Sequence, residues 1–357
     1  MVPEARNDSL IDRLLAAGLL PDALVRIGIR RAVGARLREE RDRFDRDRYV
    51  RMLRGSPIAV DTSSANEQHY EVPTEFFRRV LGSRLKYSCA WWPDGVTSLD
   101  AAEETMLRLT CERARLRDGQ SILELGCGWG SLTLWMAERY PNSRIVAMSS
   151  SATQKRWIDS RGFANVEVRT ADMRTFDAGE RFNRVVSVEM FEHMRNYEAL
   201  MRRIASWLEP GGLLFVHVFS HARYAYLFED NGPSDWMARH FFTGGQMPSH
   251  DLLPQFQDDL RLTEQWSFDG QHYQRTAEAW LANMDRHQAE VRPILEATYG
   301  AENATRFVAY WRIFFMACAE VWGYRAGTEW GVSHYVFEPP HSQGRAVPRA
   351  KSLRAKS

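Results

Sequence analysis

The sequence predicts an α/β protein with a doubly wound, mostly parallel sheet. In the centre of the chain, short strand-like runs alternate with amphipathic helical stretches. One apolar run, 121–125, leads into a glycine-rich turn and then a helix, as crossover connections between parallel strands require. The chain has 357 residues, of which 44% are hydrophobic and 26% charged, and this suits one large folded domain with additions.

The individual elements follow from local periodicity and apolar runs. Strands are expected at 121–125, 144–148, 166–170, 183–188 and 213–219, with two later runs at 260–267 and 331–337. Helices are expected between them at 131–140, 152–160 and 197–208. An aromatic-rich insertion, about 220–258, and a helical region, 276–325, separate the fifth strand from the last one.

Both ends of the chain differ from this centre. Residues 1–68 are predicted to form helices and a linker, and the segment 26–54 carries eleven arginines against five acids. The favoured interpretation is a solvated helix with i,i+4 ion pairs, and the alternative is a basic face for anionic lipid or a partner. The tail, 339–357, is small, polar and basic, and we expect it to be disordered.

Composition excludes several classes of protein. The net charge of +1 argues against a nucleic-acid binder. The four cysteines form no CxxC pair, so no metal site is expected and a reducing, cytoplasmic compartment is favoured. No apolar run approaches the roughly 20 residues of a membrane span, although peripheral contact with a membrane and a homodimer both remain open.

The glycine-rich turn indicates which ligand to expect. Gly126, Gly128 and Gly130 follow a strand, and glycines there let a ligand approach the backbone closely. The third glycine comes one place too early for the dinucleotide fingerprint, and the second strand ends in serines instead of an acid. Glu124, two positions before this GxGxG, suits the amino-acid end of S-adenosyl-L-methionine (SAM). The alternative is a glycine turn with no ligand.

Several separated motifs, in order, resemble the cyclopropane-fatty-acid synthase family of SAM-dependent methyltransferases. Within that family the likeness is to the coclaurine N-methyltransferase branch. Besides the glycine turn, it rests on the stretches 69–77, 189–196, 241–249 and 310–324. It spans about residues 10–338.

The resemblance implies a class I, Rossmann-like methyltransferase fold with seven strands, the last of them inserted antiparallel. It implies a methyltransferase domain at 69–338, whose insertion at about 220–258 and helices at 276–325 cap the active site. It also implies cofactor contacts at Tyr87, Ser88, Gly126, Gly128, Gly130, Gln154, Asp172 and Met173. Asp172 would reach the adenine amino group, and a helix N-cap is its plainer alternative.

Two acids and a histidine follow the predicted fourth strand. An alkylamine is mostly protonated at neutral pH, so its methylation needs a nearby base. The resemblance matches Glu192 and His193 to the pair that handles the amine and its proton, and Glu189 to a position that is glycine in a typical cyclopropane synthase. We expect His193 or Glu192 to accept the proton while Glu189 and Glu71 hold the ammonium; capping or ion-pair roles are the alternative.

The lipid branch of the family offers a second interpretation. It implies a bicarbonate that takes the final proton, at positions matching Cys89, Glu192, His217 and Tyr273, with Tyr70 in the same pocket. Cys318 matches a cysteine marked as active in that branch, where the plant enzymes carry valine. Both Cys318 and His217 also suit ordinary core packing.

The sequence therefore favours SAM-dependent N-methylation of a small, tetrahydroisoquinoline-like amine by direct SN2 transfer, with S-adenosylhomocysteine as the second product. The many aromatic residues outside the sheet favour a flat acceptor. One alternative is methylene or methyl transfer to an unsaturated fatty-acyl chain. The other is a SAM-binding protein without catalysis.

Overall fold

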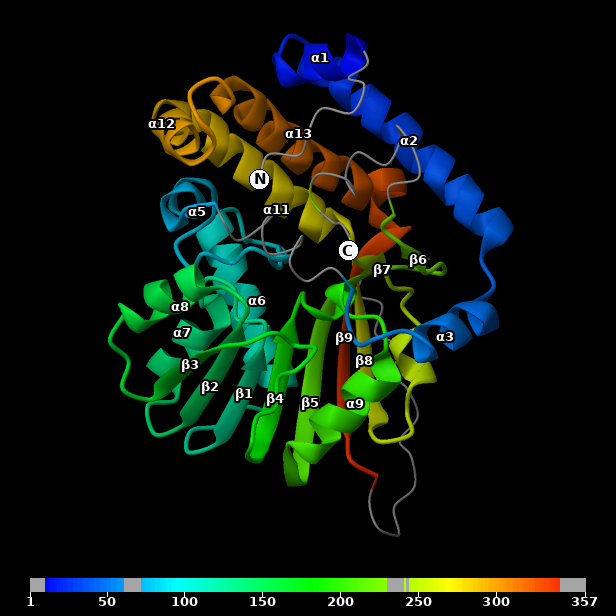
Figure 1. The fold of residues 1–357 in the computed structure, drawn as a ribbon, viewed down its shortest axis with the longest axis vertical. Helices are drawn as coiled ribbons and strands as arrows, with labels where there is room; N and C mark the ends of the chain where they lie inside the picture. The colour runs from blue at the N-terminus through cyan, green and yellow to red at the C-terminus, as the bar shows by residue number, and fades with distance from the viewer. Residues whose placement is uncertain (1–9, 61–71, 230–240, 242–243, 341–357) are drawn as a thin grey trace.

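A seven-stranded sheet forms the centre of the computed structural model, which describes residues 10–60, 72–229, 241 and 244–340. In spatial order, its strands are β3 (Val166–Thr170), β2 (Arg144–Ser149), β1 (Ser121–Leu125), β4 (Phe182–Val188), β5 (Leu208–His221), β9 (Trp330–Glu338) and β8 (Arg261–Asp269). Only β9 is antiparallel to its neighbours, and it lies between β5 and β8. The predicted fold class, with its antiparallel last strand, is confirmed (Figure 1).

Helices cover both faces of the sheet because strand residues point alternately to either side. On one face, Ile122 and Phe215 pack under α6 (Leu99–Arg113) and α7 (Ser131–Arg139). On the other face, Leu123 and Val216 pack under α9 (Tyr197–Ser206) and α3 (Arg46–Arg54), while α8 (Ala152–Asp159) covers the edge near β3. The site residues that follow each strand therefore rest on a rigid, layered support.

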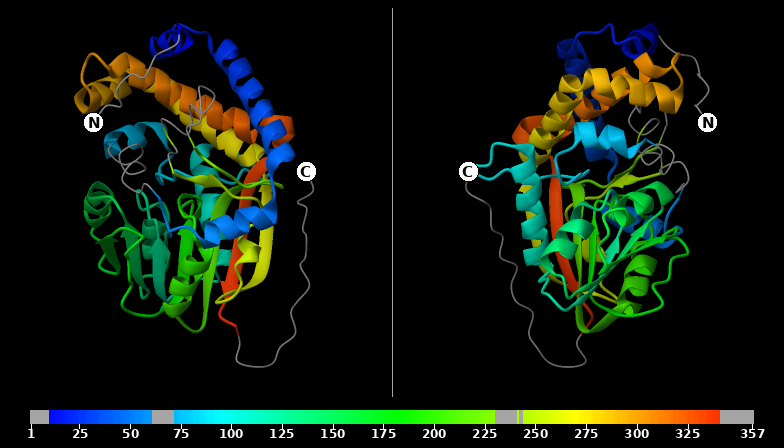
Figure 2. Two further views of the ribbon diagram at one scale, coloured as in Figure 1. Left: turned by 45° about the vertical axis from the view of Figure 1, so that its right-hand side comes forward. Right: turned by 90° about the vertical axis from the view of Figure 1, so that its left-hand side faces the viewer.

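A second group of helices lies across the end of the sheet where the parallel strands finish (Figures 1 and 2). It consists of α1 (Leu10–Ala16), α2 (Asp22–Arg43), α5 (Thr74–Val80), α11 (Gln271–Arg286), α12 (Gln288–Tyr299) and α13 (Ala304–Trp322). The short strands β6 (Tyr226–Leu227) and β7 (Gln246–Met247) pair beside them. These helices, which we call the cap, place aromatic side chains opposite the ends of β4 and β5.

The arginine-rich helix α2 differs from the solvated helix that its sequence favours. Arg36 does pair with Glu39 and Glu40 one turn away, as expected. However, Arg26 and Arg30 both bind Glu320 of α13, whose side chain is buried. One side of α2 is therefore an internal contact of the cap, and its arginines there are held by carboxylates.

Some predictions lie outside the described residues. Tyr70, Glu71 and the stretch 341–357 belong to the parts of the chain that the structure does not describe. None of the described helices combines the length and the apolar character needed to cross a bilayer. Within the described ranges, no group of His, Cys, Asp and Glu side chains is arranged to hold a metal ion.

Candidate active site

The three glycines of the turn after β1 have different tasks. All three have positive φ, from 52° at Gly128 to 81° at Gly126 and Gly130. A Cβ at Gly126 would come within 2.8 Å of the Met190 side chain, and one at Gly130 within 2.7 Å of Ile158. A Cβ at Gly128 would meet nothing within 4 Å. Gly126 and Gly130 therefore permit close packing, whereas Gly128 leaves open space above the backbone.

A small cavity of about 70 Å³ opens at this turn. Most of the residues predicted to contact the cofactor line it: Tyr87, Ser88, Glu124, Gly126, Gly128 and Gln154. Ser88 and Tyr87 come from the loop before α6, and Gln154 comes from the first turn of α8, whose N-cap is Ser151. Segments far apart in the sequence thus meet at the carboxyl end of β1, where ligands bind in open α/β sheets.

Three predicted cofactor residues lie outside this cavity lining. Gly130 is the N-cap of α7 and packs against α8. Met173 is buried in the core beneath α9. Asp172 accepts hydrogen bonds from the backbone and the guanidinium of Arg174, so it caps a turn and not the helix suggested as its alternative. A cofactor contact at each of these three positions stays a prediction.

The polar atoms around the cavity suit a ligand rich in hydrogen-bonding groups. Gln154 Nε2, Ser131 Oγ and Trp129 Nε1 are buried and have no hydrogen-bond partner among the described residues. Such atoms are costly unless a ligand or water satisfies them. Glu124 is also buried and accepts a hydrogen bond from Thr133 Oγ1, 2.5 Å from Oε2. These residues fit a cofactor with a cationic amino-acid end and a polar nucleoside.

Cofactor binding is expected to weaken as the pH falls below about 8. Burial raises the pKa of Glu124 to about 8, so its carboxyl binds a proton below that pH in the free protein. The α-ammonium of SAM favours the ionised carboxylate, so binding expels this proton. Calorimetric titration should show the dissociation constant for SAM rising by up to about tenfold per pH unit below pH 8.

Glu124→Gln is the matched variant for this measurement. It keeps the size of the side chain but removes the titrating group, so binding should be weaker at pH 8 and nearly independent of pH. A wild-type dissociation constant that stays constant between about pH 6 and pH 9 contradicts the assignment of Glu124 to the ammonium.

A second cavity, of about 140 Å³, lies between the end of β4 and the cap. It shares Tyr87 and Glu189 with the first cavity. The predicted catalytic residues Glu189, Glu192 and His193 line it together with Tyr273. Its remaining walls are mainly aromatic and apolar: Phe219, Tyr226, Phe228, Met247, Trp280, Phe314, Cys318, Val321 and Trp322. The two cavities meet at Glu189, which places a carboxylate where a methyl donor and its acceptor would approach each other.

Glu189 is held in a strained backbone conformation directly after β4. Its φ of 46° is uncommon for a residue with a side chain. Its Oε1 accepts from the backbone N–H of Cys89 at 2.9 Å and lies 3.1 Å from His217 Nε2, while the Tyr273 hydroxyl donates to Oε2 at 2.6 Å. Three elements therefore fix the position of this carboxylate.

These contacts do not bear out the bicarbonate that the lipid branch implies. Three of its four implied partners, the Cys89 N–H, His217 and Tyr273, instead contact the carboxylate of Glu189. A carboxylate resembles bicarbonate in shape and charge, so the side chain takes the place of the ion. The plainer interpretation of His217 as a core histidine is half correct, because the ring is fully buried but also contacts the site.

The neighbouring titratable groups have different protonation states. Burial alone would raise the pKa of Glu189, but the hydrogen bond from His217 and the charge of Lys86 hold it below its usual value. Burial and the charge of Glu189 raise the pKa of Glu192 well above its usual value. Burial lowers the pKa of His193 to about 4. These shifts favour an ionised Glu189, a protonated Glu192 and a neutral His193.

Lys86 is a site residue that the sequence did not suggest. It is fully buried, its ammonium donates to Ser88 Oγ, and it lines the smaller cavity. Burial lowers its pKa, against the opposing effect of Glu189. Its position directly before the predicted contacts Tyr87 and Ser88 was the available signal. The lysine supplies positive charge close to Glu189.

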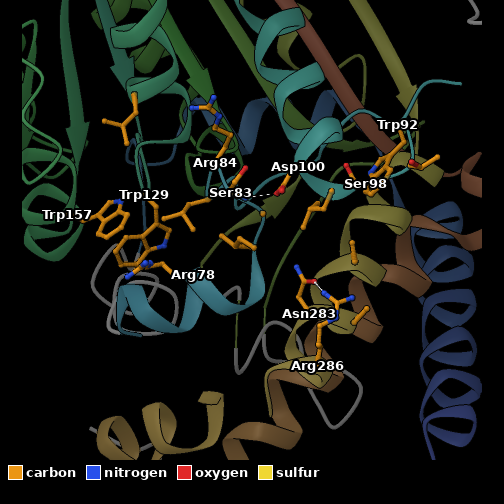
Figure 3. A pocket seen from close by; sticks show the side chains of 18 of the residues that line it. Arg78, Ser83, Arg84, Trp92, Ser98, Asp100, Trp129, Trp157, Asn283 and Arg286 are labelled. Carbon is orange, nitrogen blue, oxygen red and sulfur yellow. Dashed lines mark hydrogen bonds between the residues drawn. The ribbon is translucent and has the colours of Figure 1, made fainter. Parts of the chain in front are cut away.

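A larger groove, of about 870 Å³, lies beside the cofactor cavity and shares Leu85 and Trp129 with it. In Figure 3, Trp129 and Trp157 lie close together beside Arg78, and Trp92 and Ser98 lie at the other end. Its acidic side chains, Asp100 and Glu138, bind the Ser83 N–H and Arg84. The lining of this groove contains none of the predicted catalytic residues Glu189, Glu192 and His193.

Comparisons with known proteins show which enzymes this chain is similar to. (S)-Coclaurine N-methyltransferase from Thalictrum flavum subsp. glaucum is 38% identical over 338 residues, which cover 91% of this chain and 94% of the relative. A crystal structure of coclaurine N-methyltransferase bound to N-methylheliamine and SAH matches with a TM-score of 0.87 at 36% identity, over 91% of this chain and 98% of that one. Cyclopropane-fatty-acyl-phospholipid synthase from Escherichia coli (strain K12) is 29% identical over 287 residues, 79% of this chain and 70% of the synthase.

The fold and the two adjoining cavities define a class I SAM-dependent methyltransferase, and SAM is its cofactor. Residues 59–328 match the family model described as mycolic acid cyclopropane synthetase. The chain belongs to this family, which confirms the resemblance seen in its motifs.

Proposed function

We propose that this enzyme transfers the methyl group of SAM to the nitrogen of a small amine with an apolar, ring-containing body. The observation that carries the proposal is the Glu189 carboxyl group, which contacts the Cys89 N–H, His217 and Tyr273 in a cavity whose remaining walls are mainly aromatic and apolar. A carboxylate there attracts an ammonium group, while the aromatic faces accept flat rings and cations. Two relatives named (S)-coclaurine N-methyltransferase and pavine N-methyltransferase support the same class of acceptor.

Glu189 would hold the amine through the one lone pair of its carboxylate oxygens that no protein donor uses. A carboxylate offers about four acceptor sites on its two oxygens. The Cys89 N–H and His217 use the two sites of Oε1, and Tyr273 uses one site of Oε2. The substrate N–H can therefore donate to Oε2. This single contact leaves the nitrogen lone pair pointing away from Glu189, where it is free to attack the methyl group.

Glu192 is the group best suited to accept the amine proton. SAM supplies a methyl group on a cationic sulfur, which an unprotonated nitrogen attacks directly. Glu192 Oε2 is buried and has no partner among the described residues, and the pKa of this carboxyl lies well above its usual value. An arriving ammonium favours ionisation of Glu192, whose own proton then leaves to solvent, and the resulting carboxylate can accept the proton from nitrogen. His193 remains neutral and lines the same cavity.

The acceptor is tested by product mass. Purified protein with SAM is offered secondary amines of the tetrahydroisoquinoline class or vesicles of unsaturated phospholipid. The proposal expects a methyl group on the amine, stoichiometric S-adenosylhomocysteine and no change in the lipid. A CH₂ unit gained by the fatty-acyl chains, with the amines unchanged, overturns the proposal in favour of the lipid chemistry that the Escherichia coli relative is named for.

A further inference from the structure

A chain of hydrogen bonds connects Glu189 with an arginine at the far side of the sheet. His217 Nδ1 lies 2.8 Å from His334 Nε2, and His334 Nδ1 lies 2.7 Å from Arg113 Nη1. His217 and His334 are opposite each other in the register of β5 and β9, and both are fully buried. Arg113 is the last residue of α6, which runs along the sheet beside β9 (Figure 2).

The arginine gives this chain a direction. A guanidinium can only donate, so His334 Nδ1 must accept and the ring proton of neutral His334 lies on Nε2. His334 therefore donates to His217 Nδ1, which leaves the proton of His217 on Nε2. That proton points at Glu189 Oε1, 3.1 Å away. A protonated Glu189 that donated to His217 would need both rings in the opposite tautomer, which Arg113 excludes.

We infer that Arg113 and His334 are positioning residues for methyl transfer: by fixing the direction of the chain Arg113–His334–His217–Glu189, they keep Glu189 as a carboxylate. The inference rests on the proposed function only in that Glu189 is taken to bind the substrate amine. Neither residue lines the cavities, so both act through His217.

Arg113 is held where this role requires. Its guanidinium carbon lies 4.4 Å from the centre of the Trp266 ring and 4.8 Å from that of Phe268, both on β8. Among the described residues it has no ion-pair partner, and its one hydrogen bond goes to His334.

The other titratable groups nearby do not reverse the direction of these hydrogen bonds. Burial keeps both histidines neutral, since it lowers the pKa of His217 to about 4 and that of His334 well below its usual value. Burial also raises the pKa of the Cys89 thiol and the Tyr273 phenol, so both stay neutral. Other titratable groups that interact with the four residues of the hydrogen-bond chain are Lys86, Glu192 and His193 near Glu189, and Glu112 and Glu264 near Arg113.

The first test reads the tautomers without any substrate. Nitrogen-15 spectra of histidine-labelled wild-type protein should show neutral His217 and His334, both protonated on Nε2, at about pH 7. In Arg113→Met, whose side chain still packs on the aromatic rings, His334 should lose this restriction and show both tautomers. An Nδ1 proton or an imidazolium at His334 in the wild type overturns the inference.

The second test uses the pH profile of kcat/KM for the acceptor found by product mass, measured with SAM saturating at every pH, so that protonation of Glu124 does not set the acidic limb. Without the guanidinium, Glu189 can take up a proton at higher pH. The acidic limb of the kcat/KM profile should therefore lie about one pH unit higher in Arg113→Met than in the wild type. The matched control is Arg115→Met, which removes an arginine bound to Glu264 and Glu338 but leaves the chain intact. An unmoved limb in Arg113→Met, or an equal shift in both variants, overturns the inference. Wild-type protein that methylates no amine contradicts the proposed function and leaves the tautomer test valid.

Discussion

Replacing Glu189 by glutamine is expected to lower kcat/KM for the amine by roughly 10²–10³-fold. The variant has nearly the same size, but it lacks the negative charge that holds the ammonium. Its amide would also turn an N–H toward one of three donors, the Cys89 N–H, His217 or Tyr273. Steady-state kinetics with SAM and the amine measure the loss, which we expect in both kcat and KM.

Glu192→Gln serves as the comparison for this variant. If Glu192 takes the proton, its replacement lowers mainly kcat, and raising the pH toward the pKa of the free amine should restore much of the rate. Glu189→Gln should show no such recovery, because its defect is in holding the substrate. Wild-type kinetics in Glu189→Gln contradict the central part of the proposed mechanism.

The second large effect is expected on stability, from Gly270→Ala. Gly270 joins β8 to α11, and a Cβ there would come within 2.0 Å of the Trp322 carbonyl oxygen and 2.4 Å of that of Trp330. Backbone atoms cannot move aside as a flexible side chain can, so the cap must shift away from the sheet. We expect a loss of about 3 kcal/mol or more in the free energy of unfolding, visible as a lower midpoint in thermal or urea denaturation.

Gly28→Ala provides the control. Gly28 lies within α2, and a Cβ there would meet nothing within 4 Å. Alanine is the better helix former, so this change should stabilise the protein by up to about 1 kcal/mol. A Gly270→Ala protein as stable as the wild type would show that the junction of sheet and cap is looser than the structure indicates.

Local patterns in the sequence predicted most of the sheet. The expected strand at 121–125 coincides with β1, and the late run 331–337 lies within β9, because apolar alternation reports burial directly. The environment of the arginine-rich segment was harder to predict, because its pattern of charges is the same whether the carboxylate partners lie on its own helix or on another. Arg26 shows this, because its partners, Glu278 and Glu320, are more than 250 residues away in the sequence.

The sequence identified most residues of the candidate site, but it could not predict which of them contact one another. The family motif identified Glu189, and its surroundings then came from β5, α11 and the loop before α6. Only the fold brings Tyr273 and the Cys89 N–H to one carboxylate, so the sequence could not exclude a bicarbonate between them. His334 looked like any polar residue within a strand, because its role depends on its register with His217.

The place of β9 affects how the protein is made on the ribosome. The strand is the last element of the described chain, yet it pairs between β5 and β8 and carries His334. Until residue 338 has left the exit tunnel, a nascent chain must keep β5 and β8 apart or leave their edges exposed. Synthesis through residue 338 therefore precedes completion of the sheet, and no shorter nascent chain can form the hydrogen bond between His334 and His217 behind Glu189.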